Sequence, residues 1–321
     1  MVMLFFKIPL LFLLLFTFAF SNTSNNKKIA YIASDMSIPF WKILSRGIQN
    51  AGATYKYDVQ IYSSNNSAKE ELASVVKAIE DKVDGIIISP TNSSACVTVL
   101  KLAKNANIPV VIADIGTDGG EYLSYISSHN QQGAYEIGKV LTDKMMKLGL
   151  EEGKVGIIAI PQKRLNGQAR TQGFMQALNE ANIKGANIKQ QVDFSLEETY
   201  VLTKELIVAN PNLKAIWLQG SDKYQGALNA IYEAGKKDQI LLITFDAEPI
   251  FLELIPKGIL VGAAMQQPFL MGEEAMKALH LHFNQKSVNK NIQLPILAIS
   301  SENIETMLPI IKRNVLGLST K

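Results

Sequence analysis

The sequence predicts an α/β protein with two Rossmann-like lobes, each built on a doubly wound parallel sheet. Strand-like and helix-like segments alternate along most of the 321 residues. The strand-like segments are near-continuous aliphatic runs, as expected when helices cover both faces of a parallel sheet. These units fall into two successive sets of about five, which indicates two similar lobes rather than one large sheet.

The first set of units begins after a polar segment at residues 21–28. Strands are expected at 29–33, 59–62, 85–89 and 110–114, and helices at 40–53, 68–82 and 93–106. In the helix at 68–82 the apolar residues Leu72, Val75, Val76 and Ile79 recur at helical spacing.

The second set repeats this alternation. Strands are expected at 155–160, 187–194, 215–219 and 241–246, and helices at 167–182, 196–209 and 223–234. A strand at 260–267, a helix at 268–283 and a strand at 294–300 complete the fold. The tail after Asn303 is amphipathic and is expected to dock as a helix.

The N-terminus has the layout of a secretory signal peptide at residues 1–21. Lys7 precedes an apolar run from Ile8 to Phe20. The small residues Ala19 and Ser21 occupy positions −3 and −1 of a signal-peptidase cleavage site after Ser21. The run is shorter than the roughly 20 residues that span a bilayer, although an uncleaved anchor is the alternative. Together with the single Cys96, which allows no intramolecular disulfide, this predicts a protein of the bacterial periplasm.

Composition and motifs argue against several functions. A net charge of +3 with scattered basic residues gives no footprint for nucleic acid. No nucleophile elbow, phosphate loop or dinucleotide fingerprint is present. Among the three His residues, His280 and His282 diverge on a helix and His129 has no partner to activate, so neither a metal nor a cofactor is expected. An enzyme is therefore disfavoured.

Polar residues stand where the predicted strands end, and in open parallel sheets ligands bind beyond these carboxyl ends. Asp114 ends a strand of the first lobe and Asp246 ends one of the second. Each Asp alone could be a helix N-cap, and the pair could be the acid and base of a glycoside hydrolase. Their matched positions in both lobes favour a shared cleft.

The residue types at these strand ends suit a small polyhydroxylated ligand. Ionised carboxylates accept strong hydrogen bonds from adjacent hydroxyls, and Arg donates in a planar fork. Phe40 and Trp41 follow Pro39 at the start of a helix, where one can line the cleft while the other packs in the core. Their faces would pack on the CH-rich faces of a sugar ring.

The chain resembles the ribose/galactose-type periplasmic sugar-binding proteins, whose type I fold is shared with the effector cores of LacI-type repressors. The resemblance runs from Lys28 to Ile299. It is carried by IPFWKILSRGIQNAG, SNNSAKEELASVVKAIEDKVDGIIISPTNSSA, NANIPVVIAD, ARTQGFMQAL, TFDAEP and AAMQQP, in this order. The order and spacing of these motifs make the match specific.

The resemblance implies two lobes joined by a hinge of three crossovers, near 128–130, 266–267 and 294–298. The N-terminal lobe would comprise 27–128 plus 267–295, and the C-terminal lobe 129–266 plus 296–321. The ligand contacts it implies are Ser34, Phe40, Trp41, Ser89, Asp114, Asn130, Arg170, Phe194, Asp246 and Gln266.

The chain departs from the family pattern at three places. Ile38 stands before the Pro, where a polar residue is common, and Ile115 follows the first-lobe Asp, where Arg is frequent. Gly220 and Ser221 replace the expected Asn–Asp, so that the Asn contact is lost or passes to Ser221. Fewer fixed polar groups imply a ligand with fewer hydroxyls, a deoxy or methylated sugar, or another small molecule.

The resulting hypothesis is a soluble, monomeric periplasmic protein that captures a small sugar-like ligand by hinge closure and delivers it to an ABC transporter. The alternative is a sensor that docks on a histidine kinase or chemoreceptor. A transcription-factor effector core is disfavoured, because an export signal stands where the DNA-binding helices would be.

Overall fold

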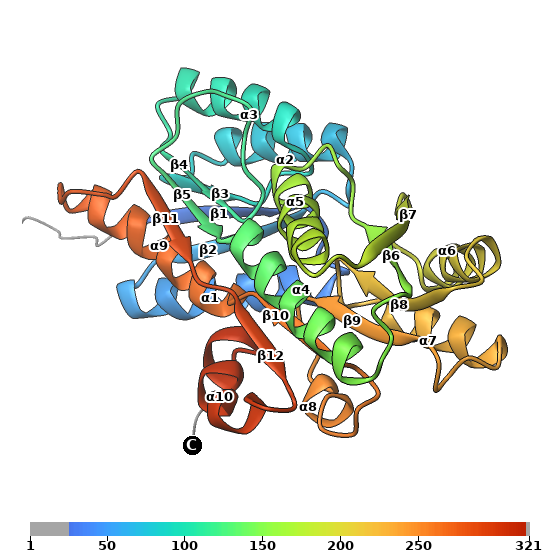
Figure 1. Cartoon of the computed structure of the whole chain (residues 1–321). Coiled ribbons are helices and arrows are strands. Elements are labelled where there is room, and N and C mark those ends of the chain that lie inside the picture. The colour runs from blue at the N-terminus through green and yellow to red at the C-terminus, as the bar shows by residue number, and fades with distance from the viewer. Residues whose placement is uncertain (1–25, 319–321) are drawn as a thin grey trace, which may run out of the picture.

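The computed structural model describes residues 26–318, and the predicted signal peptide at 1–21 lies outside the described residues. The chain forms two lobes, each a six-stranded sheet with helices on both faces (Figure 1). This confirms the predicted fold class. None of the helices within 26–318 combines the length and apolar character needed to cross a membrane.

The N-terminal sheet has the order β11-β5-β4-β3-β1-β2, and every neighbouring pair is parallel. Its strands are β1 (Lys28–Ala33), β2 (Asp58–Ser63), β3 (Gly85–Ile88), β4 (Val110–Ala113), β5 (Ser124–Ser128) and β11 (Asn291–Leu294). One face is covered by α1 (Pro39–Tyr55) and α9 (Pro268–Phe283), and the other by α2 (Ala68–Glu80) and α3 (Ser93–Asn105) (Figure 1).

The C-terminal sheet has the order β12-β10-β9-β8-β6-β7, in which only the edge strand β12 is antiparallel to its neighbour. Its strands are β6 (Lys154–Ala159), β7 (Lys184–Gln190), β8 (Leu213–Leu218), β9 (Leu241–Phe245), β10 (Gly262–Met265) and β12 (Leu297–Ser300). The helices α4 (Asn130–Lys147) and α5 (Leu165–Glu180) cover one face, and α6 (Leu196–Ala209), α7 (Tyr224–Glu233) and α8 (Phe251–Leu254) the other.

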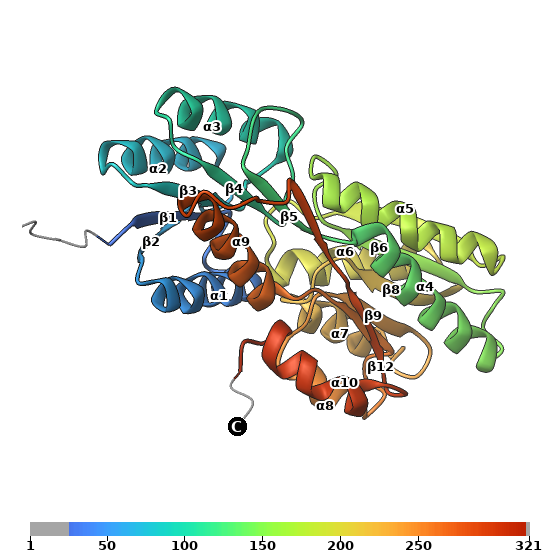
Figure 2. The ribbon, with the colours of Figure 1, turned by 90° about the vertical axis from the view of Figure 1, so that its left-hand side faces the viewer.

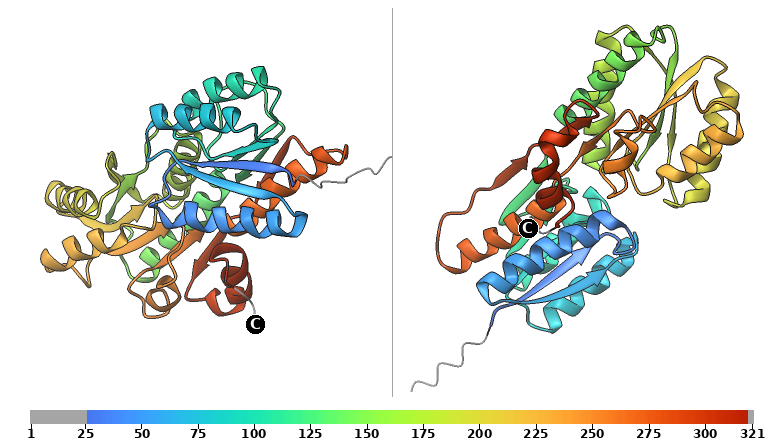
Figure 3. Two further views of the ribbon diagram at one scale, coloured as in Figure 1. Left: turned by 180° about the vertical axis from the view of Figure 1, so that it is seen from behind. Right: turned by 90° about the horizontal axis from the view of Figure 1, so that it is seen from below.

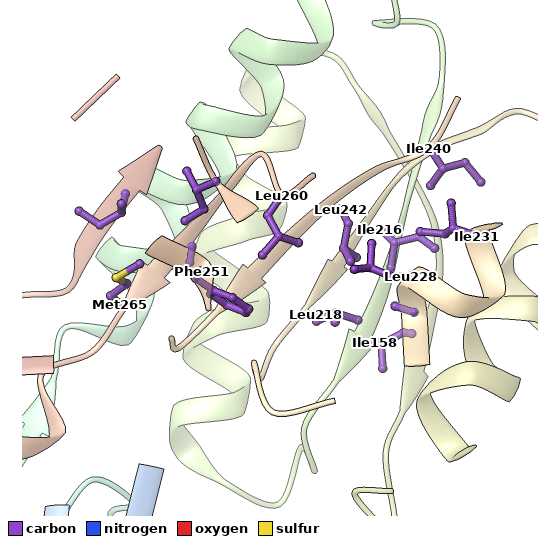
Figure 4. Close-up of a cluster of buried hydrophobic side chains, with 14 of the residues drawn as sticks. Ile158, Ile216, Leu218, Leu228, Ile231, Ile240, Leu242, Phe251, Leu260 and Met265 are labelled. Atoms are coloured by element: carbon purple, nitrogen blue, oxygen red, sulfur yellow. The ribbon is translucent and has the colours of Figure 1, made fainter. Parts of the chain in front are cut away.

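Each sheet is buried on both faces, which explains why its strands are aliphatic throughout. Along β8, Ile216 and Leu218 join the core under α6, α7 and α8, whereas Trp217 points to the opposite core under α4 and α5. Figure 4 shows the first of these clusters, with Ile216, Leu218, Leu228 and Phe251 converging from the sheet and its helices.

Three segments connect the lobes, as predicted. The chain crosses between β5 and α4 near His129, between β10 and α9 at 266–267, and between β11 and β12 at Pro295 and Ile296. Figure 2 shows the third segment joining β11 to β12, and Figure 3 shows the lobes from behind and from below. The crossings lie together, since His129 N donates to Leu294 O at 3.0 Å and Gln267 Nε2 donates to Pro295 O at 2.8 Å, which is the arrangement that a hinge requires.

Some predicted boundaries were wrong. The strand expected at 187–194 is β7 at Lys184–Gln190, and residues 191–194 form a loop in which Phe194 adopts a left-handed φ of 53°. The single strand expected at 294–300 is divided between the two sheets, because Pro295 lies between β11 and β12 and has no N–H to donate. The helix α4 has no counterpart among the predicted elements.

The tail docks as helix, as predicted, and it touches both lobes. The helix α10 (Ile304–Ile310) packs on β12, and the π-helix η1 (Ile311–Val315) packs against α9 of the N-terminal lobe. The Arg46 guanidinium donates from α1 to the Leu316 carbonyl oxygen at 2.7 Å. The prediction assigns 296–321 to the C-terminal lobe alone, whereas the end of this segment contacts both lobes.

Candidate ligand-binding site

A cavity of about 60 Å³ lies between the lobes, at the carboxyl ends of both sheets. Side chains of both lobes form its walls. The lining residues are Ile38, Phe40, Trp41, Asp114, Ile160, Arg164, Asn166, Arg170, Gln191, Phe194, Gly220, Ser221, Asp222, Asp246, Glu248 and Gln266. Eight of the residues predicted as ligand contacts are in this set: Phe40, Trp41, Asp114, Arg170, Phe194, Ser221, Asp246 and Gln266.

The two aspartates occupy equivalent positions. Asp114 follows β4 and Asp246 follows β9, and both have left-handed backbones, with φ of 70° and 65°. Each backbone N–H donates to the neighbouring strand, from Asp114 to Ile126 O and from Asp246 to Ala264 O. Asp tolerates this region better than most residues, so the chain can end each strand sharply and turn the carboxylate into the cavity.

The Asp114 carboxylate is only partly satisfied. Its side chain is 3% exposed, and Oδ2 accepts one hydrogen bond from Asn166 Nδ2 at 3.2 Å. No partner for Oδ1 exists within residues 26–318. Burial raises the pKa of Asp114 to about 6, although the positive charge of the Arg170 guanidinium lowers this pKa in part. Such an acceptor is available to a ligand that brings a donor.

The Asp246 carboxylate is held more tightly. Its Oδ1 accepts from Gln266 Nε2 at 2.6 Å, and its Oδ2 lies 3.6 Å from Arg170 Nη1. Burial raises the pKa of Asp246, although the Arg170 guanidinium opposes this. Gln266, from the second crossover, keeps Oε1 without a hydrogen-bond partner in the described part of the chain. Gln266 lines the cavity, so this buried oxygen is a second acceptor that a ligand donor could serve.

Arg170 organises the C-terminal side of the site from α5. It is 2% exposed, its Nε donates to Asn130 Oδ1 at 2.9 Å, and its Nη1 donates to Gln219 O at 2.7 Å. The guanidinium also lies 3.9 Å from the centre of the Phe245 ring. Because these contacts fix the guanidinium, it is positioned before any ligand arrives.

Arg164 was not predicted as a site residue, yet its side chain makes three hydrogen bonds between the lobes. It precedes α5 in the C-terminal lobe and donates to three oxygens of the N-terminal lobe: Thr91 O at 3.2 Å, Ser34 Oγ at 3.3 Å and Asn66 Oδ1 at 2.9 Å. Burial lowers its pKa to about 10, so it stays charged at neutral pH.

The two residues after Arg164 also reach across. Leu165 N donates to Ser93 Oγ at 3.4 Å, and Asn166 bonds Asp114 as described above. Three consecutive residues of one lobe therefore contact the other, and this structure has the lobes closed on each other.

Three aromatic side chains complete the walls. Phe40 and Trp41 pack edge to face, with ring centres 4.8 Å apart. Trp41 is 4% exposed and belongs to the core under α1, whereas Phe40 is partly exposed. Phe194 lines the opposite wall in a loop whose N–H groups donate to the carboxylate of Glu198. The rings thus come from both lobes.

Ile38 is the cap residue of α1 and offers the helix no side-chain hydrogen bond. An extended backbone before Pro39 is the expected geometry, but Ile leaves the N-terminal N–H groups uncapped. Its side chain lines the cavity instead. A residue that is poor for the helix is thereby placed where it makes part of the wall apolar.

Three predicted contacts are not on the cavity wall. The Ser34 hydroxyl is hydrogen-bonded to Asn66 and Arg164, and the Ser89 hydroxyl to the Tyr31 hydroxyl at 3.2 Å. The Asn130 side chain accepts a hydrogen bond from Arg170. All three are buried. Their short side chains hold other groups in place, and a direct contact with a ligand stays a prediction for them.

Asp222 and Glu248 were missed by the sequence reasoning and lie on the wall beside Ser221. Ser221 Oγ donates to Glu248 Oε1 at 2.8 Å, and Asp222 pairs with Lys223 Nζ at 2.7 Å. Burial raises the pKa of Glu248 to about 7, and the charges of Asp222 and Asp246 add to this. Their positions in the sequence could have indicated them, since Asp222 and Glu248 follow the ends of predicted strands by three and two residues.

The side chains on the wall indicate the kind of ligand that the cavity can hold. Within residues 26–318 no group of His, Cys, Asp and Glu side chains is arranged to hold a metal ion. The cavity instead offers carboxylates, guanidinium groups and aromatic faces, which can bind an organic ligand through hydrogen bonds and ring packing.

The periplasmic binding protein domain family matches residues 29–287 of the chain. The ribose import binding proteins RbsB of Escherichia coli and Bacillus subtilis are both 29% identical, over 80% and 86% of this chain and 85% and 88% of their own lengths. A solute binding protein from Agrobacterium radiobacter, solved in complex with D-arabinose, superposes with a TM-score of 0.83 at 22% identity, covering 91% of this chain and 99% of that one. The chain therefore belongs to the periplasmic binding protein family and has its two-lobed type I fold.

Proposed function

We propose that this protein captures a small sugar-like ligand in the interlobe cavity and delivers it to an ABC transporter of the bacterial membrane. The observation that carries the proposal is an interlobe cavity lined by Asp114 and Gln266, whose buried oxygens Asp114 Oδ1 and Gln266 Oε1 lack donors among the described residues. A buried polar atom without a partner costs about 1–3 kcal/mol. Hydroxyl groups of a bound ligand would supply the missing donors.

The remaining walls fit the same ligand. The Arg170 guanidinium is held in place from α5, and Phe40, Trp41 and Phe194 present ring faces and edges. Aromatic faces pack on the CH-rich side of a sugar ring while the polar groups bond its edge. Ile38 favours a ligand that is apolar at one position, such as a deoxy or methylated sugar.

Closure gives the mechanism of capture. The predicted lobes, 27–128 plus 267–295 and 129–266 plus 296–321, would turn about the three crossovers as rigid bodies. In the closed state a ligand contacts Asp114 of one lobe together with Arg170 and Asp246 of the other. Since these contacts cannot all form when the lobes are apart, ligand binding shifts the equilibrium toward closure.

The named relatives support the place of action and the partner. Three of them are a ribose import binding protein of Escherichia coli, its counterpart in Bacillus subtilis and a D-allose-binding periplasmic protein of Escherichia coli. A periplasmic location and delivery to an import system, rather than catalysis on the ligand, are the functions we assign by this likeness. Asp114 and Asp246 then act as acceptors and not as the acid and base of a hydrolase.

A thermal-shift screen tests this function. Pentoses, hexoses, deoxy sugars and polyols would be added to the protein, and a ligand at 100 times its Kd adds about 2.7 kcal/mol to the unfolding free energy. We expect a clear rise in Tm with at least one sugar, and a rise of about half or less in Asp114→Asn and Asp246→Asn. The exposed Asp143→Asn on α4 is the matched control. Full stabilisation in either cavity variant, or none with any compound, contradicts the proposal.

A further inference from the structure

We propose that the ligand carries an ammonium group besides its hydroxyls, and that Glu248, with Asp222 beside it, is the residue that recognises this group. The inference rests on the proposed function above, and it names the ligand class as an amino sugar or a similar polyhydroxylated amine. It follows from the charges on the cavity wall, from the hydrogen-bonding atoms left free, and from the space beside Gly220.

The charges on the wall do not balance. Four carboxylates line the cavity and only two guanidinium groups do. Asp246 lies 3.6 Å from Arg170, and Asp222 is paired with Lys223 at 2.7 Å. Within residues 26–318, neither Asp114 nor Glu248 has an ion pair, and Glu248 is the one that lies beside Asp222.

Arg164, the second guanidinium, does not neutralise Glu248. Its Nε and Nη2 groups are used by Thr91 O, Ser34 Oγ and Asn66 Oδ1 of the opposite lobe. When all four carboxylates are ionised, they outnumber the three cations Arg164, Arg170 and Lys223 by one. A cationic ligand would neutralise that charge, whereas with a neutral sugar Glu248, whose pKa burial raises to about 7, would take up a proton.

The free hydrogen-bonding atoms point to a ligand rich in donors. Asp114 and Gln266 are 3% and 2% exposed, and each keeps one oxygen on the wall without a partner in the described chain. Both oxygens are acceptors. A hydroxyl can donate only one hydrogen bond, whereas an ammonium group donates up to three and accepts none. Two hydroxyl groups can serve these two oxygens, and an ammonium group at Glu248 would add donors to a wall that is rich in acceptors.

Glu248 is the carboxylate best placed to receive it. Ser221 Oγ donates to its Oε1 at 2.8 Å, and the charged or titratable groups that face it are Asp222, Lys223 and Tyr224 from the start of α7 and Asp246 after β9. Burial keeps its pKa near 7, so the carboxylate is poorly compensated in the empty protein. An ammonium group at bonding distance would favour its ionised form.

Gly220 leaves room for this group. A Cβ atom at that position would meet one neighbour within 4 Å, Asp222 Oδ1 at 3.9 Å, so the wall beside Asp222 is open. A larger residue would fill this space. The departure from the family pattern at 220–222 thus opens a pocket next to two carboxylates, Asp222 and Glu248.

The test is a set of matched pairs in which one hydroxyl or ring oxygen is replaced by nitrogen. D-Glucose would be compared with D-glucosamine, 6-amino-6-deoxy-D-glucose and nojirimycin, and D-galactose with D-galactosamine, by calorimetric titration at pH 7. At least one amine should bind about tenfold tighter than its parent, the factor that 1.4 kcal/mol represents. Glu248→Gln should reduce this ratio about tenfold, and the exposed Glu253→Gln of the same lobe should not change it.

The outcomes separate the two proposals. If neutral sugars bind and no amine of the set binds tighter than its parent, the ammonium inference is wrong and the proposed function stands. An amine preference that survives in Glu248→Gln also overturns it. If neither sugars nor amines bind, the proposed function is wrong, and the ammonium inference that rests on it is wrong as well. Should Glu248→Gln not fold, the paired affinities of the unsubstituted protein still decide.

Discussion

The substitution Asp114→Asn should have opposite effects on stability and on binding. Asn is nearly the same size as Asp and tolerates the left-handed backbone found here at φ 70°, where Ala would add strain. Its amide oxygen can keep the hydrogen bond from Asn166 Nδ2. The change therefore removes the charge and replaces one carboxylate oxygen by an NH2 group.

The magnitude for the empty protein follows from the pKa. Asp114 titrates at about 6 in the folded protein against 3.8 ordinarily, so the folded state binds this proton more tightly than the unfolded state. A raised carboxyl pKa means that stability falls as pH rises from about 4 to about 6, and the loss is complete above pH 7. At about 1.4 kcal/mol per pKa unit, the ionised group costs about 3 kcal/mol. Asn removes that cost, so we expect the empty protein to be more stable by about 1–3 kcal/mol at pH 7.5.

Binding should change in the opposite direction. A hydrogen bond to a charged group contributes about 1.5–3 kcal/mol, so the loss of the carboxylate should weaken the tightest sugar of the screen by about 10- to 150-fold. Chemical denaturation gives the stability and calorimetric titration the affinity, with Asp143→Asn as control. Destabilisation of the empty variant by more than about 1 kcal/mol, or an unchanged Kd, would refute the reasoning.

Three further predictions concern other residues of the site. Arg164→Ala removes the donor to Thr91 O, Ser34 Oγ and Asn66 Oδ1, so the empty protein should open and its radius of gyration in solution scattering should increase; an unchanged radius would contradict this. The pKa of Glu248, raised to about 7, should make the protein lose on the order of 2 kcal/mol between pH 5 and pH 8, and Glu248→Gln should lose correspondingly less in denaturant titrations; equal losses would show that Glu248 is not responsible. Ile38→Asn supplies the cap that α1 lacks and should stabilise the protein by about 1 kcal/mol, while it weakens binding of a deoxy sugar relative to its hydroxylated parent; the reverse preference would refute the role of Ile38.

The fold could be predicted because burial on both sides of a sheet leaves a strong pattern. The strands before Asp114 and Asp246 are VVIA and LLITF, which are almost wholly apolar, and the two carboxylates of the cavity follow their ends. The helix α4 was predictable too, since Ala134, Ile137 and Leu141 recur at helical spacing. The division at Pro295 was harder, because two short strands in different sheets look like one.

The rest of the site depends on how far side chains reach, which strand ends do not indicate. Arg164 looks like a surface residue of the loop PQKRLNG, but its long side chain crosses the interface and is buried there. Ser34 and Ser89 stand at strand ends, yet their short hydroxyls bond neighbouring side chains before they can reach the cavity. Which polar atoms remain free is a property of the packed structure.

The central claim is that the interlobe cavity holds a small polyhydroxylated ligand. A crystal structure of the protein grown with the tightest compound of the screen tests it most directly. The compound should lie between Phe40 and Arg170, with donors within hydrogen-bond distance of Asp114 Oδ1 and Gln266 Oε1. Ordered water alone in the cavity, or the compound bound on an outer face of either lobe, would contradict the claim.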